Sequence, residues 1–282
     1  MFTSVAEPRG LSLDLPSASL VRASLIVPTL NESVSIGHVL RTFRAAAEEG
    51  NRTLFASDPL EWEMIVVDGA STDGTAEAAA AEGARVVVER RKGYGRAYKT
   101  GFAEANGAVI ATLDGDATYP AEEVPRLVKY LFDRDLDFLT CNRLAHLDRK
   151  AMTTEHRFGN WALNQFLHIA YHHYLAAAPG GTIRDSQSGM WIFRRSVLDR
   201  VELTQDGMPF SEELKIEVLL RGCKFEEVPI RYAERWGAPK LSTWQDGRAN
   251  LMFLLRKRFA IARARQHRGQ MPLSQARESP VR

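Results

Sequence analysis

The chain has 282 residues, of which 45% are hydrophobic and 26% are charged, and its formal net charge is +2 at pH 7. These are ordinary values for a globular protein, and the length suffices for one large α/β domain or two small ones. The nearly balanced charge argues against a general nucleic-acid binder, so no nucleic acid is expected among the partners.

The cysteines and the chain ends indicate the cellular compartment of the protein. Cys141 and Cys223 form neither a metal-ligand spacing nor a disulfide framework, which predicts a reducing compartment and two small core residues. The amino end lacks the apolar segment of a signal peptide, and no run approaches the ~20 apolar residues of a membrane span. We therefore expect a cytoplasmic protein. Residues 1–22 are predicted to be a flexible tail, and residues 251–282 a basic helix with a tail.

Between these ends, in a single predicted domain at residues 23–250, short apolar runs alternate with helix-like stretches. Strands are predicted at residues 24–28, 63–67, 84–88, 108–113 and 136–141. Helices are predicted at residues 34–49, 75–82, 96–106 and 121–133. This alternation is typical of an α/β fold with one Rossmann-like, mostly parallel sheet and helices on both faces. Ligands of such sheets bind beyond the carboxyl ends of the strands.

Two carboxylates stand one glycine apart in the stretch ATLDGDATYP, residues 111–120, where the fourth apolar run ends. Like charges this close repel each other unless a cation, a proton or water offsets them. Asp114 and Asp116 therefore predict a hard divalent cation, Mg²⁺ or Mn²⁺, which binds through one or two carboxylates and completes its shell with waters and substrate phosphates. A solvated acidic turn is the alternative interpretation.

Three other chemistries fit this region less well. A calcium loop needs Gly at its sixth position and Glu at its twelfth, where Tyr119 and Pro125 stand. A haloacid-dehalogenase phosphatase matches DGDAT, but that motif normally follows the first strand of its domain, and here three predicted strands precede it. The glycine-rich stretch at residues 93–101 lacks the third glycine of a dinucleotide loop and is interpreted as a helix start.

Five segments follow one another along the chain: SLIVPTLNE, EMIVVDGASTDGT, GYGRAYKTGFAEANGAVIATLDGDATYP, RDSQSGMWIFRR and VPIRYAERWGAPKLSTWQDG. Their order and spacing resemble family-2 inverting glycosyltransferases, above all the dolichol-phosphate mannose and glucose synthase group. The resemblance covers roughly residues 24–255. It implies a GT-A fold, a UDP- or GDP-linked sugar as donor, and Mg²⁺ or Mn²⁺ as cofactor.

On the donor side, the resemblance puts Pro28, Asn31 and Glu32 against the nucleoside and Asp68 at the base or ribose. Many relatives carry a second acid after that aspartate, where this chain has Gly69, so the choice between uridine and guanosine stays open. A strand-to-helix turn is the alternative interpretation of PTLNE.

The resemblance also assigns the metal ligands. Asp116 is the implied ligand, and Asp114 touches the ribose or joins the metal through a bound water. The cation then neutralises the charge that grows on the leaving diphosphate. Thr118 stands where mannose synthases often have Gln, which implies fewer protein ligands.

On the acceptor side, the resemblance puts Arg143 and Arg157 around a phosphate, and the fixed fork of arginine suits that anion. A phosphate monoester is largely ionised at neutral pH and needs no general base. A hydroxyl acceptor would need one, and Asp185 is then the candidate. Otherwise Asp185, Gln187 and Ser188 orient the sugar or the phosphate. The alternative is a polar turn before the apolar run GMWIF.

Two further groups of residues complete the prediction. Arg235 and Lys240 resemble the Arg and Lys of the flap that closes over the diphosphate in this family. The histidines at 168, 172 and 173 invite a metal interpretation, but Mg²⁺ and Mn²⁺ prefer oxygen, so we expect these side chains to be packed or exposed.

Residues 158–178 and 251–268 are the candidates for peripheral contact with the inner face of the membrane. For the second segment, a terminal helix that packs on the sheet is an equally valid interpretation. The sequence thus predicts transfer of a sugar to a polyprenyl phosphate. The alternatives are transfer to a hydroxyl of a soluble small molecule and a noncatalytic sugar-nucleotide-binding protein.

Overall fold

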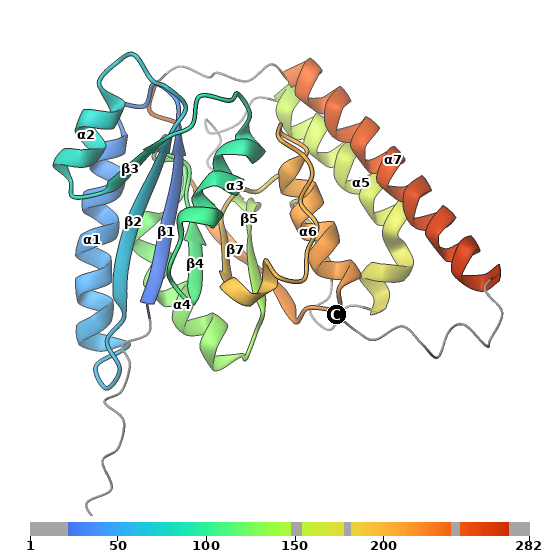
Figure 1. Cartoon of the computed structure of the whole chain (residues 1–282), viewed down its shortest axis with the longest axis horizontal. Coiled ribbons are helices and arrows are strands. Elements are labelled where there is room, and N and C mark those ends of the chain that lie inside the picture. Colours follow the sequence, from blue (N-terminus) through green and yellow to red (C-terminus); the bar gives the residue numbers. More distant parts are fainter. Residues whose placement is uncertain (1–21, 148–153, 178–181, 238–242, 271–282) are drawn as a thin grey trace, which may run out of the picture.

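The computed structural model describes residues 22–147, 154–177, 182–237 and 243–270 (Figure 1). The strands are β1 (Arg22–Thr29), β2 (Glu61–Asp68), β3 (Arg85–Val88), β4 (Val109–Thr112), β5 (Phe138–Leu147), β6 (Trp191–Arg194) and β7 (Phe225–Tyr232). The helices are α1 (Ile36–Thr53), α2 (Thr75–Ala81), α3 (Tyr94–Glu104), α4 (Val124–Asp133), α5 (Thr154–Ala177), α6 (Phe210–Leu220) and α7 (Thr243–Gln270). The tail predicted at residues 1–22 lies outside the described residues except for Arg22, which begins β1, and residues 271–282 also lie outside them.

The strands form one sheet in the order β3-β2-β1-β4-β6-β5-β7. Strand β1 pairs in parallel with β2 on one side and β4 on the other. The order of the strands reverses between β1 and β4, and ligands of open α/β sheets bind at such a switch point. Strand β6 runs antiparallel to both β4 and β5, whereas β5 and β7 are parallel. The prediction of a mostly parallel sheet is confirmed.

Helices cover both faces of the sheet (Figure 1). The core on one face joins β1, β4 and β5 to α1 and α4, and the core on the other face joins the sheet to α3, α5, α6 and α7. Helix α1 illustrates the cause, because its buried residues recur three and four positions apart along one stripe: Ile36, Val39, Leu40, Phe43 and Ala47. Cys141 and Cys223 are both buried and free, as predicted.

Two elements differ in extent from the prediction. Strand β5 continues beyond residue 141 to Leu147, because β7 pairs with it as far as Tyr232. The basic helix predicted from residue 251 begins at Thr243, so α7 runs across the predicted boundary at residue 250. Its first turns are polar and carry no apolar stripe, which concealed them in the sequence. Within the described residues, no helix has the length and apolar character required to cross a bilayer.

Candidate active site

The loops after β1, β2 and β4 lie at the same edge of the sheet (Figure 1). Each loop contains one residue with a left-handed backbone that is not glycine: Asn31 at φ 52°, Ala70 at φ 60° and Ala117 at φ 63°. Such conformations cost on the order of 1–3 kcal/mol each and cluster at ligand-binding sites. The three loops therefore mark this edge as the candidate site.

Hydrogen bonds join the loops after β1 and β2. The Asn31 N–H donates to Ser71 Oγ at 2.8 Å, and Asn31 Oδ1 accepts from the Thr72 N–H at 2.9 Å. The Glu32 N–H donates to Thr75 Oγ1 at 2.8 Å. The two sequence motifs thus form one surface.

Asp68 is held inside this surface. Its side chain is almost fully buried and accepts the Ser71 N–H at 2.9 Å and the Ser71 hydroxyl at 2.5 Å. The Thr29 hydroxyl donates to it at 3.3 Å, and the half-buried Pro28 precedes Thr29 at the end of β1. The structure thus brings together the four predicted donor-side residues, Pro28, Asn31, Glu32 and Asp68. Their contact with a nucleoside stays a prediction.

Asp116, the predicted metal ligand, is 4% exposed. Its Oδ1 accepts the Thr118 N–H at 3.1 Å and the Thr118 hydroxyl at 2.6 Å, so Thr118 orients this carboxylate. Its Oδ2 lies 2.8 Å from Nη2 of Arg235, which is also 3.3 Å from Oε1 of Glu32. A side-chain cation therefore already faces the carboxylate that was predicted to bind one.

Asp114 accepts hydrogen bonds from two phenols that the sequence did not single out. The hydroxyls of Tyr94 and Tyr98 lie 3.4 and 3.3 Å from its Oδ1. Burial raises the pKa of Asp114 to about 7, and the Asp116 charge adds to this shift. Arg143 and Arg235 oppose the shift without cancelling it. An added cation is favourable beside such a carboxyl group.

The glycine-rich stretch at residues 93–101 is a helix start, as predicted, because α3 begins at Tyr94. It also supplies the two phenols at Asp114. A side chain at Gly189 would place a Cβ 2.0 Å from the Tyr94 hydroxyl, so glycine is needed there. The only sequence signal for this role is the four-residue spacing of Tyr94 and Tyr98, which puts both on one helix face.

The carboxylates fit a divalent cation that has further ligands from a substrate. Among the residues that the structure describes, no three or more His, Cys, Asp or Glu side chains form a metal-binding group. Asp114 and Asp116 supply carboxylate oxygens, and Mg²⁺ often binds through one or two carboxylates together with waters and substrate phosphates. The contact of Arg235 with Asp116 supports this fit, because it turns an oxygen of that carboxylate toward positive charge.

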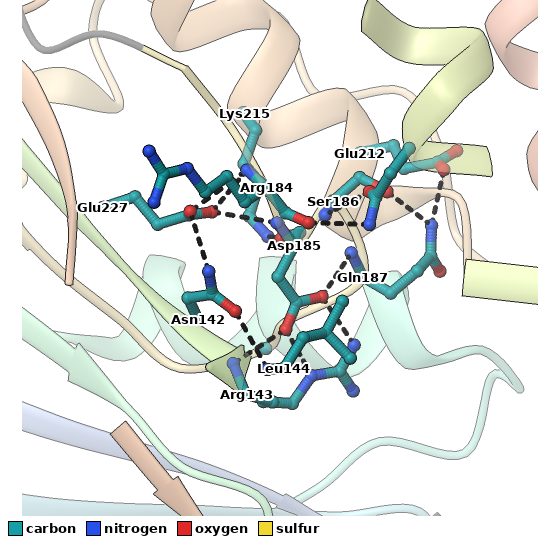
Figure 2. Close-up of polar contacts among 12 residues, drawn as sticks. Asn142, Arg143, Leu144, Arg184, Asp185, Ser186, Gln187, Glu212, Lys215 and Glu227 are labelled. Carbon is teal, nitrogen blue, oxygen red and sulfur yellow. Dashed lines mark hydrogen bonds and ion pairs between the residues drawn. The ribbon is translucent and has the colours of Figure 1, made fainter. Parts of the chain in front are cut away.

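Arg143 and Asp185 form a buried, two-pronged ion pair between β5 and the segment before β6 (Figure 2). Arg143 Nε and Nη2 each donate to a different oxygen of Asp185 at 2.8 Å, and the Arg143 N–H donates at 2.9 Å. Burial opposes ionisation of Asp185, but Arg143 and Lys215 outweigh it and hold the pKa of that carboxyl below its usual value. The Arg143 guanidinium also lies over the ring of Tyr232, 5.4 Å from its centroid.

Two further charged residues lie beside this pair, the buried Lys215 and the partly buried Glu227 (Figure 2). Lys215 Nζ donates to the backbone oxygen of Asp185 at 2.6 Å, and Glu227 accepts the Asp185 N–H at 2.9 Å. Burial lowers the pKa of Lys215 to about 8, against the pull of Asp185 and Glu227. Burial raises the pKa of Glu227. The backbone around Asp185 is therefore fixed by one buried and one partly buried charged side chain.

Gln187 links three parts of the chain. Its Nε2 donates to Glu212 Oε1 on α6 at 2.5 Å, its Oε1 accepts from Asn250 on α7 at 2.8 Å, and its N–H donates to Asp185 at 3.2 Å. Burial raises the pKa of Glu212 to about 8. Ser188 is fully buried, and its hydroxyl has no hydrogen-bond partner among the described residues.

Helix α6 carries two more site residues that sequence reasoning missed, Glu212 and Lys215. Its sequence FSEELKIEVLL contains four charged residues and resembles an exposed helix. In the structure all its residues from Phe210 to Leu219 are buried. The only signal was the distribution of its apolar residues around the whole helix, which is typical of a buried helix.

The other predicted site residues lie apart from this network. Arg157 is exposed near the start of α5 and has no ion-pair partner in the described part of the chain. Lys240 lies outside the described residues. His168 contacts the Ile183 carbonyl oxygen at 2.7 Å, while His172 and His173 are exposed, which agrees with packing or exposure.

A mostly parallel sheet with one antiparallel strand, and two aspartates beyond β4 next to its switch point, are the features expected of a GT-A fold. The family model "Glycosyl transferase family 2" matches residues 24–202. The chain belongs to this family, and the predicted family and fold are confirmed.

Two curated relatives come from Haloferax volcanii. The low-salt glycan biosynthesis hexosyltransferase Agl6 is 32% identical over 82% of this chain and 52% of its own length. A dolichyl-phosphate hexose transferase is 31% identical over 80% of this chain and 89% of its own length. A dodecaprenyl-phosphate galacturonate synthase of Rhizobium johnstonii is 30% identical over 72% of this chain and 56% of its own. The chain thus spans about half the length of two of these three proteins.

Among solved structures, glucosyl-3-phosphoglycerate synthase from Mycobacterium tuberculosis is similar in fold. Its complex with Mn²⁺, UDP and phosphoglyceric acid has a TM-score of 0.66 and 21% identity, over 84% of this chain and 78% of that chain. At this identity the likeness supports the fold alone.

Proposed function

We propose that the protein transfers a hexose, with inversion, from a UDP- or GDP-linked donor to a polyprenyl phosphate, in a reaction that depends on Mg²⁺ or Mn²⁺. The acceptor assignment rests on the ionised, fully hydrogen-bonded side chain of Asp185. Both its oxygens accept hydrogen bonds from Arg143, and its pKa is held low. Such a carboxylate is a poor base, and an ionised phosphate acceptor requires none.

On the donor side, the loops after β1 and β2 would hold the nucleoside, and Asp114 and Asp116 would face the diphosphate. A bound divalent cation would neutralise charge on the leaving nucleotide. Thr118, Tyr94 and Tyr98 serve this step by fixing the two carboxylates through their hydroxyls. The names of the relatives support sugar transfer to a lipid phosphate.

On the acceptor side, Arg157 is an exposed cation that has no ion-pair partner in the described part of the chain. It stands seven residues before Asn164, so the two share a helix face at a spacing of ~10 Å. Asn164 binds the segment that carries Asp185, through the Arg184 oxygen at 2.7 Å and the Ser186 N–H at 2.9 Å. We therefore assign Arg157 to the acceptor phosphate, on the helix face that leads to the segment of Asp185.

Helices α5 and α7 pack against each other, and both begin at the end of the sheet that carries the site (Figure 1). Their exposed large apolar residues are Phe158, Trp161 and Ile169 on α5 and Leu251, Met252 and Phe259 on α7. Exposed arginines flank them on α7 at Arg248, Arg256 and Arg263. A surface of this composition fits the interface of an anionic membrane, where a polyprenyl phosphate would be presented.

The test is an acceptor comparison. Labelled UDP- and GDP-hexoses are incubated with the protein, Mn²⁺ and vesicles that contain either polyprenyl phosphate or the matching polyprenol, and lipid product is extracted into organic solvent. We expect product from the phosphate alone, at a rate that is flat from about pH 7 to 9 and falls toward the phosphate pKa near 6. Product on polyprenol or on a soluble hydroxyl acceptor would replace this proposal with the hydroxyl alternative. If no hexose donor is consumed with any acceptor, the noncatalytic sugar-nucleotide-binding alternative is favoured.

A further inference from the structure

Arg235 contacts two carboxylates, those of Asp116 and Glu32. Its Nη2 lies 2.8 Å from Oδ2 of Asp116 and 3.3 Å from Oε1 of Glu32. The other oxygen of Asp116 already accepts two hydrogen bonds from Thr118. A divalent cation that approaches Asp116 on the Oδ2 side must therefore displace the guanidinium or share the oxygen with it.

The segment around Arg235 is fastened to the loop of the acidic pair. The Ala233 N–H donates to the Thr118 oxygen and the Trp236 N–H to the Asp116 oxygen, both at 3.0 Å. The Trp236 ring stacks on His38 of α1, with centroids 4.6 Å apart and planes 20° apart. These contacts fix the backbone on both sides of Arg235 next to the loop of Asp116. The position of the guanidinium at Asp116 therefore follows from the fold.

Arg235 nevertheless has bonding capacity to spare. Its side chain is 26% exposed, and its buried Nε has no hydrogen-bond partner among the described residues. An arginine fork is suited to two oxygens of a phosphate. A diphosphate that entered beside Asp116 would offer such oxygens and a second negative centre for the cation.

Resting on the proposed nucleotide-sugar function, we propose that the protein binds its divalent cation as the cation–diphosphate complex, and that Arg235 enforces this order. Before the diphosphate arrives, Arg235 neutralises Asp116 and competes with a lone cation. When the diphosphate is bound, Arg235 transfers to phosphate oxygens and leaves Asp116 to the metal. Cation and nucleotide therefore strengthen each other's binding, by the same factor in both directions.

The experiment measures Mn²⁺ binding from the loss of the free Mn²⁺ signal in electron paramagnetic resonance, with and without UDP or GDP. In the wild type we expect the nucleotide to tighten Mn²⁺ binding by roughly 5- to 150-fold, the usual range of such coupling. Arg235→Gln should bind Mn²⁺ alone more tightly than the wild type, by on the order of tenfold, because a like charge has been removed. Its nucleotide coupling should be smaller than in the wild type, because only the direct attraction between the cation and the diphosphate remains.

Two variants control for charge and folding. Arg235→Lys keeps the charge and should retain weak binding of Mn²⁺ alone. Arg231→Gln removes an exposed arginine of β7 and should match the wild type throughout. The inference is overturned if Arg235→Gln binds Mn²⁺ alone no more tightly than the wild type, or if nucleotide does not tighten Mn²⁺ binding in the wild type. If neither Mn²⁺ nor any nucleotide binds the wild type, the donor assignment itself fails, which is a distinguishable result.

Discussion

The donor-side loops and the acceptor-side network hold their carboxylates by different means. Asp68 and Asp116 are bound mainly by hydroxyls and backbone N–H groups of their own loops, and the one cation at Asp116 is partly exposed. Asp185 is instead fully buried and bound by Arg143, with Lys215 against its backbone. Neutral partners leave a carboxylate free to exchange one cation for another, whereas a buried ion pair is part of the folded core. On the proposed donor side Asp116 is thus free to exchange its cation, whereas on the proposed acceptor side Asp185 is held rigidly.

The largest expected effect comes from Asp116→Asn, which separates activity from stability. The shape of the side chain and one acceptor for Thr118 remain, but the charge that binds a metal is lost. We expect transfer to fall by on the order of 10³, because metal stabilisation of the leaving group is worth several kcal/mol. The unfolding temperature measured by circular dichroism should change little, since relief of the repulsion with Asp114 offsets the weaker contact with Arg235, which keeps Glu32 as a partner. Wild-type transfer by this variant would rule out a metal at Asp116.

The acceptor side should respond in the opposite way. Asp185→Asn leaves Arg143 buried without its counter-charge, and breaking a buried pair typically costs ~3–5 kcal/mol of unfolding free energy. We expect the unfolding temperature to fall by on the order of 10 °C. Glu61→Gln is the matched control, because it breaks the exposed pair with Arg22 and should leave that temperature nearly unchanged. A stable Asp185→Asn variant would contradict the structural role of the pair.

Arg157→Lys tests a cation on the proposed acceptor side that is not expected to contribute to the stability of the fold. Because the side chain is exposed and has no ion-pair partner among the residues that the structure describes, stability should stay at the wild-type level. Loss of the two-pronged geometry should weaken the acceptor by roughly tenfold to a hundredfold, seen as a higher KM for polyprenyl phosphate with donor KM unchanged. Arg126→Lys, on the exposed surface of α4, serves as the control and should not alter either KM. An unchanged acceptor KM in Arg157→Lys would remove Arg157 from the acceptor site.

The smallest expected effect is the pH dependence that Glu212 adds to stability. Its pKa is raised to about 8 in the folded state, so the folded protein keeps a proton that the unfolded chain releases from about pH 4.5 upward. Stability is therefore lost as pH rises from about 5 to 8, with a slope of at most ~1.4 kcal/mol per pH unit. Glu212→Gln cannot titrate, so denaturant unfolding at pH 5.5, 6.5 and 7.5 should show wild-type stability falling relative to the variant. A constant difference across these pH values would contradict the raised pKa.

The sequence by itself determined the architecture and the meeting of the motifs after β1, β2 and β4 at one edge of the sheet. Apolar runs separated by helical stretches specify a sheet buried on both faces, and parallel strands bring their carboxyl ends to one edge. The motifs after β1, β2 and β4 must then meet, whatever the details of packing. Asp68, Asp114 and Asp116 were predictable for this reason, because each stands within a few residues of a strand end.

Only the tertiary structure decided the partners of the buried charges. Arg143 and Asp185 are 42 residues apart, and Lys215 is 30 residues from Asp185, so no local pattern joins them. Helix α6 has the composition of a surface helix, yet packing from every side buries Glu212 and Lys215 and shifts both pKa values toward 8. The contact of Arg235 with Asp116 likewise arises only where the end of β7 meets the loop after β4. Local spacing fixes where a chain turns and which face it buries, but the energy of a charge depends on its desolvation and its neighbours, which are set only when distant segments pack together.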